Sequence, residues 1–90
     1  MNININEMYL VYIESEFIYN DKLINKTSDK LKINGKELHK IIGEDFMNNE
    51  LIEFVVSPYE MHFEFYNEEL KQYCHRQYVI KVLEGDENEG

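Results

Sequence analysis

The chain has 90 residues, 43 % of them hydrophobic, and a formal net charge of −9. This length fits one domain with a single core, and the apolar content disfavours an intrinsically disordered chain. The negative charge disfavours direct contact with nucleic acid or an anionic membrane, because both are negatively charged themselves. The longest uninterrupted apolar run, from Met8 to Ile13, is six residues, which is too short to cross a bilayer.

The sequence contains one cysteine, Cys74, which cannot form an intramolecular disulfide bond. A lone cysteine agrees with a reducing compartment. The N-terminal residues show neither the basic region nor the long apolar run of a secretory signal. We therefore expect a cytoplasmic protein.

A long strand is predicted from Met8 to Tyr19, because apolar side chains recur there at alternate positions. Glu14 and Glu16 have the opposite parity and should face solvent. The first half of the segment is apolar at both parities, owing to Leu10 and Tyr12. This pattern indicates a strand that is central in its sheet or covered on both faces.

The stretch 20–29 is polar and rich in lysine, and we expect a loop there. Lys30 to Ile33 alternates and predicts a short strand. The following Asn34-Gly35 has two interpretations, a two-residue hairpin turn or the start of a helix. We favour the helix, because the next apolar positions have helical spacing. These positions are Leu38, Ile41, Ile42 and Phe46.

The predicted helix runs from about Lys36 to Asn48. Asn34 is its candidate N-cap, and Glu37 occupies the position that completes a capping box. Gly43 inside the helix costs about 1 kcal/mol relative to alanine. A glycine inside a helix is also typical of a close approach, and we expect one here between the helix and the sheet.

Three strands are predicted after the helix. In the first, from Leu51 to Val56, the alternation places Ile52, Phe54 and Val56 on one face and Glu53 on the other. The second, from Tyr59 to Tyr66, alternates more regularly, with aromatic and methionine side chains inward and carboxylates outward. The last runs from Tyr73 to Leu83, and residues 70–73 could instead form a short helix.

Short links between strands favour antiparallel neighbours. The predicted fold is therefore α+β, a single antiparallel sheet of four to five strands with one amphipathic helix packed on one face. This domain covers residues 1–83. The remaining stretch, 84–90, is acidic and contains no apolar residue, and we expect it to be a disordered tail.

No catalytic or metal-binding motif is visible. Cys74 and His75 are adjacent and would point to opposite faces of a strand, so they cannot bind one zinc ion. Glu60, His62 and Glu64 share a face, but alternate residues stand roughly 6.6 Å apart, too far to converge on one ion. We expect no enzymatic activity, no catalytic residue, no bound metal and no cofactor.

Charge is segregated along the chain. The window from Ile41 to Glu69 contains eight carboxylates and no Lys or Arg, whereas residues 20–40 contain six lysines against three acids. Ordinary surfaces intersperse both signs. An acidic face for binding a partner is therefore predicted, with these candidate residues: Glu14, Glu16, Glu53, Glu60, Glu64, Glu68 and Glu69.

Rows of carboxylates about 6.6 Å apart would match roughly two phosphate steps of one DNA strand, so the face could imitate nucleic acid. We expect a small inhibitor that occupies a basic surface of a larger protein, such as a nucleic-acid-handling enzyme. In bulk composition the chain is similar to phage-encoded counter-defence proteins, anti-CRISPR proteins among them. The alternatives are an antitoxin or immunity protein that neutralises a cationic toxin, and a homo-oligomeric structural subunit with an exposed edge near Tyr73 to Leu83.

Overall fold

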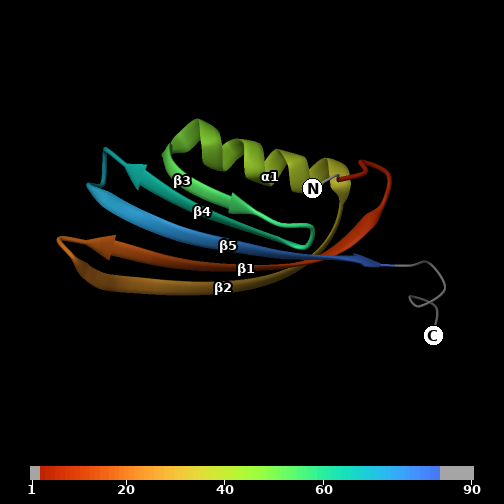
Figure 1. The fold of residues 1–90 in the computed structure, drawn as a ribbon, viewed down its shortest axis with the longest axis horizontal. Helices are drawn as coiled ribbons and strands as arrows, with labels where there is room; N and C mark the ends of the chain where they lie inside the picture. The colour runs from red at the N-terminus through yellow and green to blue at the C-terminus, as the bar shows by residue number, and fades with distance from the viewer. Residues whose placement is uncertain (1–2, 84–90) are drawn as a thin grey trace.

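The computed structural model describes residues 3–83. They form one α+β domain in which a helix packs on one face of a five-stranded antiparallel sheet (Figure 1). The sheet order is β2-β1-β5-β4-β3, so β2 and β3 are its edges. This confirms the predicted fold class. The expected disordered tail, 84–90, lies outside the described residues. Within the described part, no helix combines the length and the apolar character needed to span a membrane.

The strands and the helix follow one another along the chain with short connections. Their bounds are β1 Met8–Tyr19, β2 Lys22–Asn34, α1 Gly35–Asn48, β3 Glu50–Val56, β4 Glu60–Asn67 and β5 Gln72–Leu83. The first, third, fourth and fifth strands and the helix lie within one or two residues of their predicted positions. The second strand does not.

The predicted loop at residues 20–29 is wrong, because β2 begins at Lys22 and forms a hairpin with β1. Asn20 and Asp21 both have positive φ, 54° and 64°, as the two central residues of a type I′ turn require. The loop was predicted because this stretch has almost no apolar alternation. An edge strand that is exposed on both faces, as Lys22 to Lys30 is, needs none.

The helix begins as predicted, with the Asn34 side chain accepting a 2.8 Å hydrogen bond from the Glu37 backbone N–H. The close approach expected at Gly43 is wrong, since an added Cβ there would meet nothing within 4 Å. The tight position is Gly35, where a Cβ would lie 2.0 Å from the Asn4 carbonyl oxygen. The segment before β1 therefore packs against the start of the helix.

Three details of the second half of the sheet differ from expectation. A bulge at Ile52 shifts the register of β3, so Leu51 rather than Ile52 shares the helix-side face with Phe54. Residues 68–71 form a turn in which Lys71 has φ 58°, not a helix. β5 lies between β1 and β4, so Tyr73 to Leu83 is not the exposed edge that the oligomer alternative requires.

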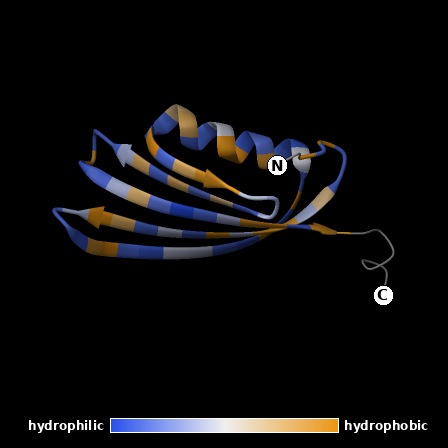
Figure 2. Ribbon diagram, viewed as in Figure 1, coloured by the Kyte–Doolittle hydropathy of each residue, from blue (hydrophilic) through white to orange (hydrophobic). Residues whose placement is uncertain are grey.

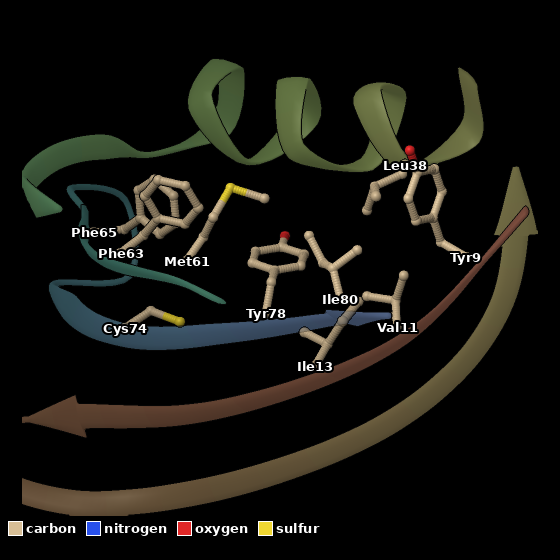
Figure 3. Close-up of a cluster of buried hydrophobic side chains, with 10 residues drawn as sticks. All are labelled: Tyr9, Val11, Ile13, Leu38, Met61, Phe63, Phe65, Cys74, Tyr78 and Ile80. Carbon is tan, nitrogen blue, oxygen red and sulfur yellow. The ribbon is translucent and has the colours of Figure 1, made fainter. Parts of the chain in front are cut away.

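The core lies between α1 and the sheet (Figure 3). β1, β4 and β5 supply most of it, and Leu38 supplies the helix contribution, fully buried. Phe46 adds edge-to-face contacts with Phe63 and Phe65, at centroid distances of 5.3 and 5.9 Å. The buried apolar residues are Tyr9, Val11, Ile13, Leu38, Met61, Phe63, Phe65, Cys74, Tyr78 and Ile80. The core thus covers only one face of the sheet, and its other face carries no element of this domain.

Candidate protein-binding surface

The outer face of the sheet, the one opposite α1, collects charged side chains from every strand. Because residues directly opposite each other in a ladder share a face, the register defines its rows. One row crosses all five strands in the order Lys26, Glu16, His75, Glu64 and Glu53. The charge therefore changes from positive to negative across the sheet, from the β2 edge toward the β3 edge.

Five of the predicted binding residues lie on this outer face. Glu53, Glu60 and Glu64 lie on β3 and β4, and Glu14 and Glu16 lie on β1. Glu14 and Glu53 are exposed and the other three are partly exposed. Glu16 lies 3.7 Å from the Lys26 ammonium, so its charge is partly compensated.

The remaining two predicted residues are separate from this group. Glu68 and Glu69 lie in the turn between β4 and β5, at one end of the sheet (Figure 1). Both are exposed. They extend the negative potential to that end but do not belong to the rows of the outer face.

The opposite part of the outer face is basic and partly apolar. Lys30 and Lys81 flank Tyr12, each with its ammonium 5.7 Å from the centroid of the Tyr12 ring. Both ammonium groups lie within cation–π distance of this ring, which is only partly buried. This explains the apolar pattern at both parities in the first half of β1, which is indeed internal in the sheet.

Two histidines lie within the acidic part. The ring centroids of His62 and His75 are 6.2 Å apart, and His62 Nε2 lies 3.2 Å from a carboxylate oxygen of Glu60. In the part of the chain that the structure describes, no three His, Cys, Asp or Glu side chains are arranged so that they could hold a metal ion.

A largely buried polar cluster on the helix side was missed by sequence reasoning. Asp45 of α1 is ion-paired with Arg76 of β5 and also accepts a hydrogen bond from the Tyr78 hydroxyl. Arg76 donates in addition to Ser15, at 2.8 Å. Burial, followed by the hydrogen bond to Asp45, raises the pKa of Tyr78 above its ordinary value. This cluster fixes the helix to the sheet and removes one carboxylate of the acidic window from solvent.

A sequence signal for this cluster exists. Asp45 is spaced as Leu38, Ile41 and Ile42 are, on the face of the helix that packs on the sheet. A carboxylate at such a position requires a buried partner. Arg76 shares the parity of Tyr78 and is the one residue of that face of β5 able to supply the opposite charge.

The two edge strands differ in chemistry. β2 presents four lysines, Lys22, Lys26, Lys30 and Lys32, a composition that disfavours pairing with another chain. Every residue of β3 is exposed, and five of its seven residues are apolar. Figure 2 shows this contrast, with most of β3 in orange and the middle of β2 mainly in blue.

Comparison of this chain with protein-family models, curated proteins and solved structures found no match.

Proposed function

We propose that this protein is an inhibitor that acts by occupancy, covering a basic surface of a larger protein with the acidic part of its outer sheet face. The proposed target is a nucleic-acid-handling enzyme, and the proposed setting is phage or mobile-element counter-defence in the cytoplasm. No chemical step is part of this function. The observation that carries the proposal is that Glu53, Glu60 and Glu64 share one uncovered face with Glu14 and Glu16.

Electrostatics supports this use of the face. Carboxylates on adjacent strands, such as Glu53 opposite Glu64, repel each other and lower the stability of the free protein. A cationic partner surface would relieve this repulsion on binding. The field would also steer the approach of such a partner, because the lysines lie toward the opposite edge and give the domain a directed dipole.

The experiment is a comparison of two charge variants against a partner captured by this protein from a host lysate. Glu60→Gln together with Glu64→Gln removes two charges from the acidic part. We expect association to slow and the dependence of the association rate on salt to flatten, since exposed charges act mainly through the on-rate. Nucleic acid should compete with the protein for that partner.

The matched control is Lys26→Gln together with Lys30→Gln, which changes the same outer face by the same number of charges. It frees Glu16 from its ion pair and makes the protein more negative, so association should stay equal or become faster. Unchanged association in the carboxylate variant, or slower association in the lysine variant, would place the contact on the lysine side and refute the proposal.

A further inference from the structure

The free edge of β3 is flanked by two grooves of different chemistry. On the helix side, a groove of about 410 Å³ is apolar and lined by residues that include Ile42, Phe46, Leu51, Phe54, Val56 and Met61. On the outer side, a groove of about 330 Å³ is lined by Glu53, Val55, His62, Glu64 and His75, with contributions from Phe54 and Phe63. One edge strand thus separates an apolar groove from an acidic one.

Within residues 3–83, no strand pairs with the outer edge of β3, so its backbone has hydrogen-bonding groups available to another strand. The Ser57 N–H donates to the Glu60 carbonyl at 2.8 Å, so position 57 points toward β4. Because these directions alternate along an antiparallel strand, the N–H groups of Phe54 and Val56 point away from β4 and toward solvent. Their side chains are 59 % and 42 % exposed on the helix side.

From these observations we propose that a partner adds a strand to the free edge of β3, and that this strand alternates apolar and cationic residues. Successive side chains of a strand point to opposite faces. The apolar side chains would enter the groove beneath α1, and the Lys or Arg side chains would enter the outer groove, with their stems on Val55 and their charges at Glu53 and Glu64. This inference rests on the proposed function, and it specifies that the basic partner binds as an added β-strand.

Charge complementarity favours such a partner over the β3 edge of a second copy of this chain. The window from Ile41 to Glu69, which contains all of β3, has no Lys or Arg. Arg76, which lies beneath the helix, is already paired with Asp45. Pairing two β3 edges would place two strands whose only charged residues, Glu50 and Glu53, are acidic side by side, and like charges on adjacent strands are destabilising.

The test uses the whole protein and two short capped peptides of equal composition. In the first peptide Lys and Val alternate, and in the second all Lys residues precede all Val residues. Binding is followed by NMR at low salt, with amide hydrogen exchange as a second readout. We expect the alternating peptide to bind at least about tenfold more tightly, and to protect the amides of Phe54 and Val56.

Two variants with matched chemistry locate the contact. Phe54→Thr with Val55→Thr removes two exposed apolar side chains from β3, whereas Leu23→Thr with Ile24→Thr removes two of similar exposure from β2. Neither changes the charge. Only the β3 variant should weaken binding of the alternating peptide, by about tenfold, as expected for central contacts of an interface.

The other outcomes separate this inference from the proposed function. If both peptides bind equally and the shifted amides lie on β1, β4 and β5 of the outer face, the inference is wrong while the proposed function stands. If neither peptide binds at low salt, both are wrong. If light scattering shows a dimer at micromolar concentration and the Phe54 and Val56 amides are already protected without peptide, a second copy occupies the edge and the inference is overturned.

Discussion

Asp45 and Arg76 form an ion pair beneath the helix, with only 12 % and 19 % of their side chains exposed. Each of the two also bonds a neutral partner, the Tyr78 hydroxyl for Asp45 and the Ser15 hydroxyl for Arg76. Asp45, although it belongs to the acidic window, therefore stabilises the fold. The carboxylates on the outer face are instead accessible to a partner.

Breaking this pair from one side should destabilise the domain strongly. Asp45→Asn leaves the Arg76 charge without its counter-ion in a largely buried site, and we expect a loss of about 3 kcal/mol in the free energy of unfolding. Asp45→Leu combined with Arg76→Met removes both charges and should recover much of that loss. Urea denaturation of the three proteins measures this, and a double variant less stable than Asp45→Asn would contradict it.

The two glycines of α1 should respond to alanine in opposite directions. Gly43→Ala adds a methyl group in open space and improves helix propensity, so we expect a gain of roughly 0.5 to 1 kcal/mol. Gly35→Ala would force the Asn4 backbone to move, because the new Cβ lies 2.0 Å from its carbonyl oxygen. We expect a clear loss of stability there. Thermal unfolding of both variants tests these two stability changes. An unchanged stability of Gly35→Ala would show that the N-terminal segment is easily displaced.

Stability should fall at alkaline pH through Tyr78. Its pKa is raised in the folded state, mainly by burial. An unfolded tyrosine loses its proton near pH 10, whereas folded Tyr78 keeps it, so the folded state binds more protons above that pH. The free energy of unfolding should then decrease by up to about 1.4 kcal/mol per pH unit from this residue.

The corresponding experiment compares how steeply the free energy of unfolding decreases with pH between about pH 10 and 12. The free energy of unfolding of Tyr78→Phe should decrease less steeply than that of the wild type. This variant should nevertheless be less stable at neutral pH, because it lacks the hydroxyl that donates to Asp45. Tyr59→Phe is the control, because Tyr59 is 70 % exposed and should leave the slope unchanged. Equal slopes for all three proteins would mean that Tyr78 titrates normally.

The β1–β2 turn offers a stabilising change. Asp21 has φ 64°, a left-handed conformation that glycine adopts without steric cost, and Asn-Gly is the preferred pair for this turn. We expect Asp21→Gly to raise the free energy of unfolding by about 0.5 to 1 kcal/mol. Asp29→Gly, in the extended part of β2, should instead be destabilising. If Asp21→Gly also destabilises, the hairpin does not form as described.

Periodic elements of this protein could be predicted from sequence and others could not. β1 and β4 were found because each has one buried face, and the helix start was found because Asn34 caps it. β2 was missed over residues 22–29 because an edge strand exposed on both faces carries no alternation. Because of the bulge at Ile52, Leu51 lies on the helix side of β3. No local sequence pattern predicts this bulge.

On the candidate surface, the alternation of residues along β4 was sufficient to predict that its carboxylates face outward. Whether Glu14 and Glu16 of β1 join them depends on β5 lying between the two strands, which is a long-range pairing that the sequence does not display. The exposure of β3 depends on the same strand order. The sequence does not display this order, so the edge position of β3 became apparent only in the fold.

The pairing of β1 with β5 also bears on how this chain reaches its native state. Met8 lies opposite Leu83, so the first and last strands meet in the middle of the sheet, while the β1–β2 hairpin and the β3–β4–β5 meander each close locally. Pairing β1 with β5 joins distant parts of the chain, and such non-local contacts slow folding. We therefore expect the two local units to form first and their docking along β1 and β5 to limit the folding rate.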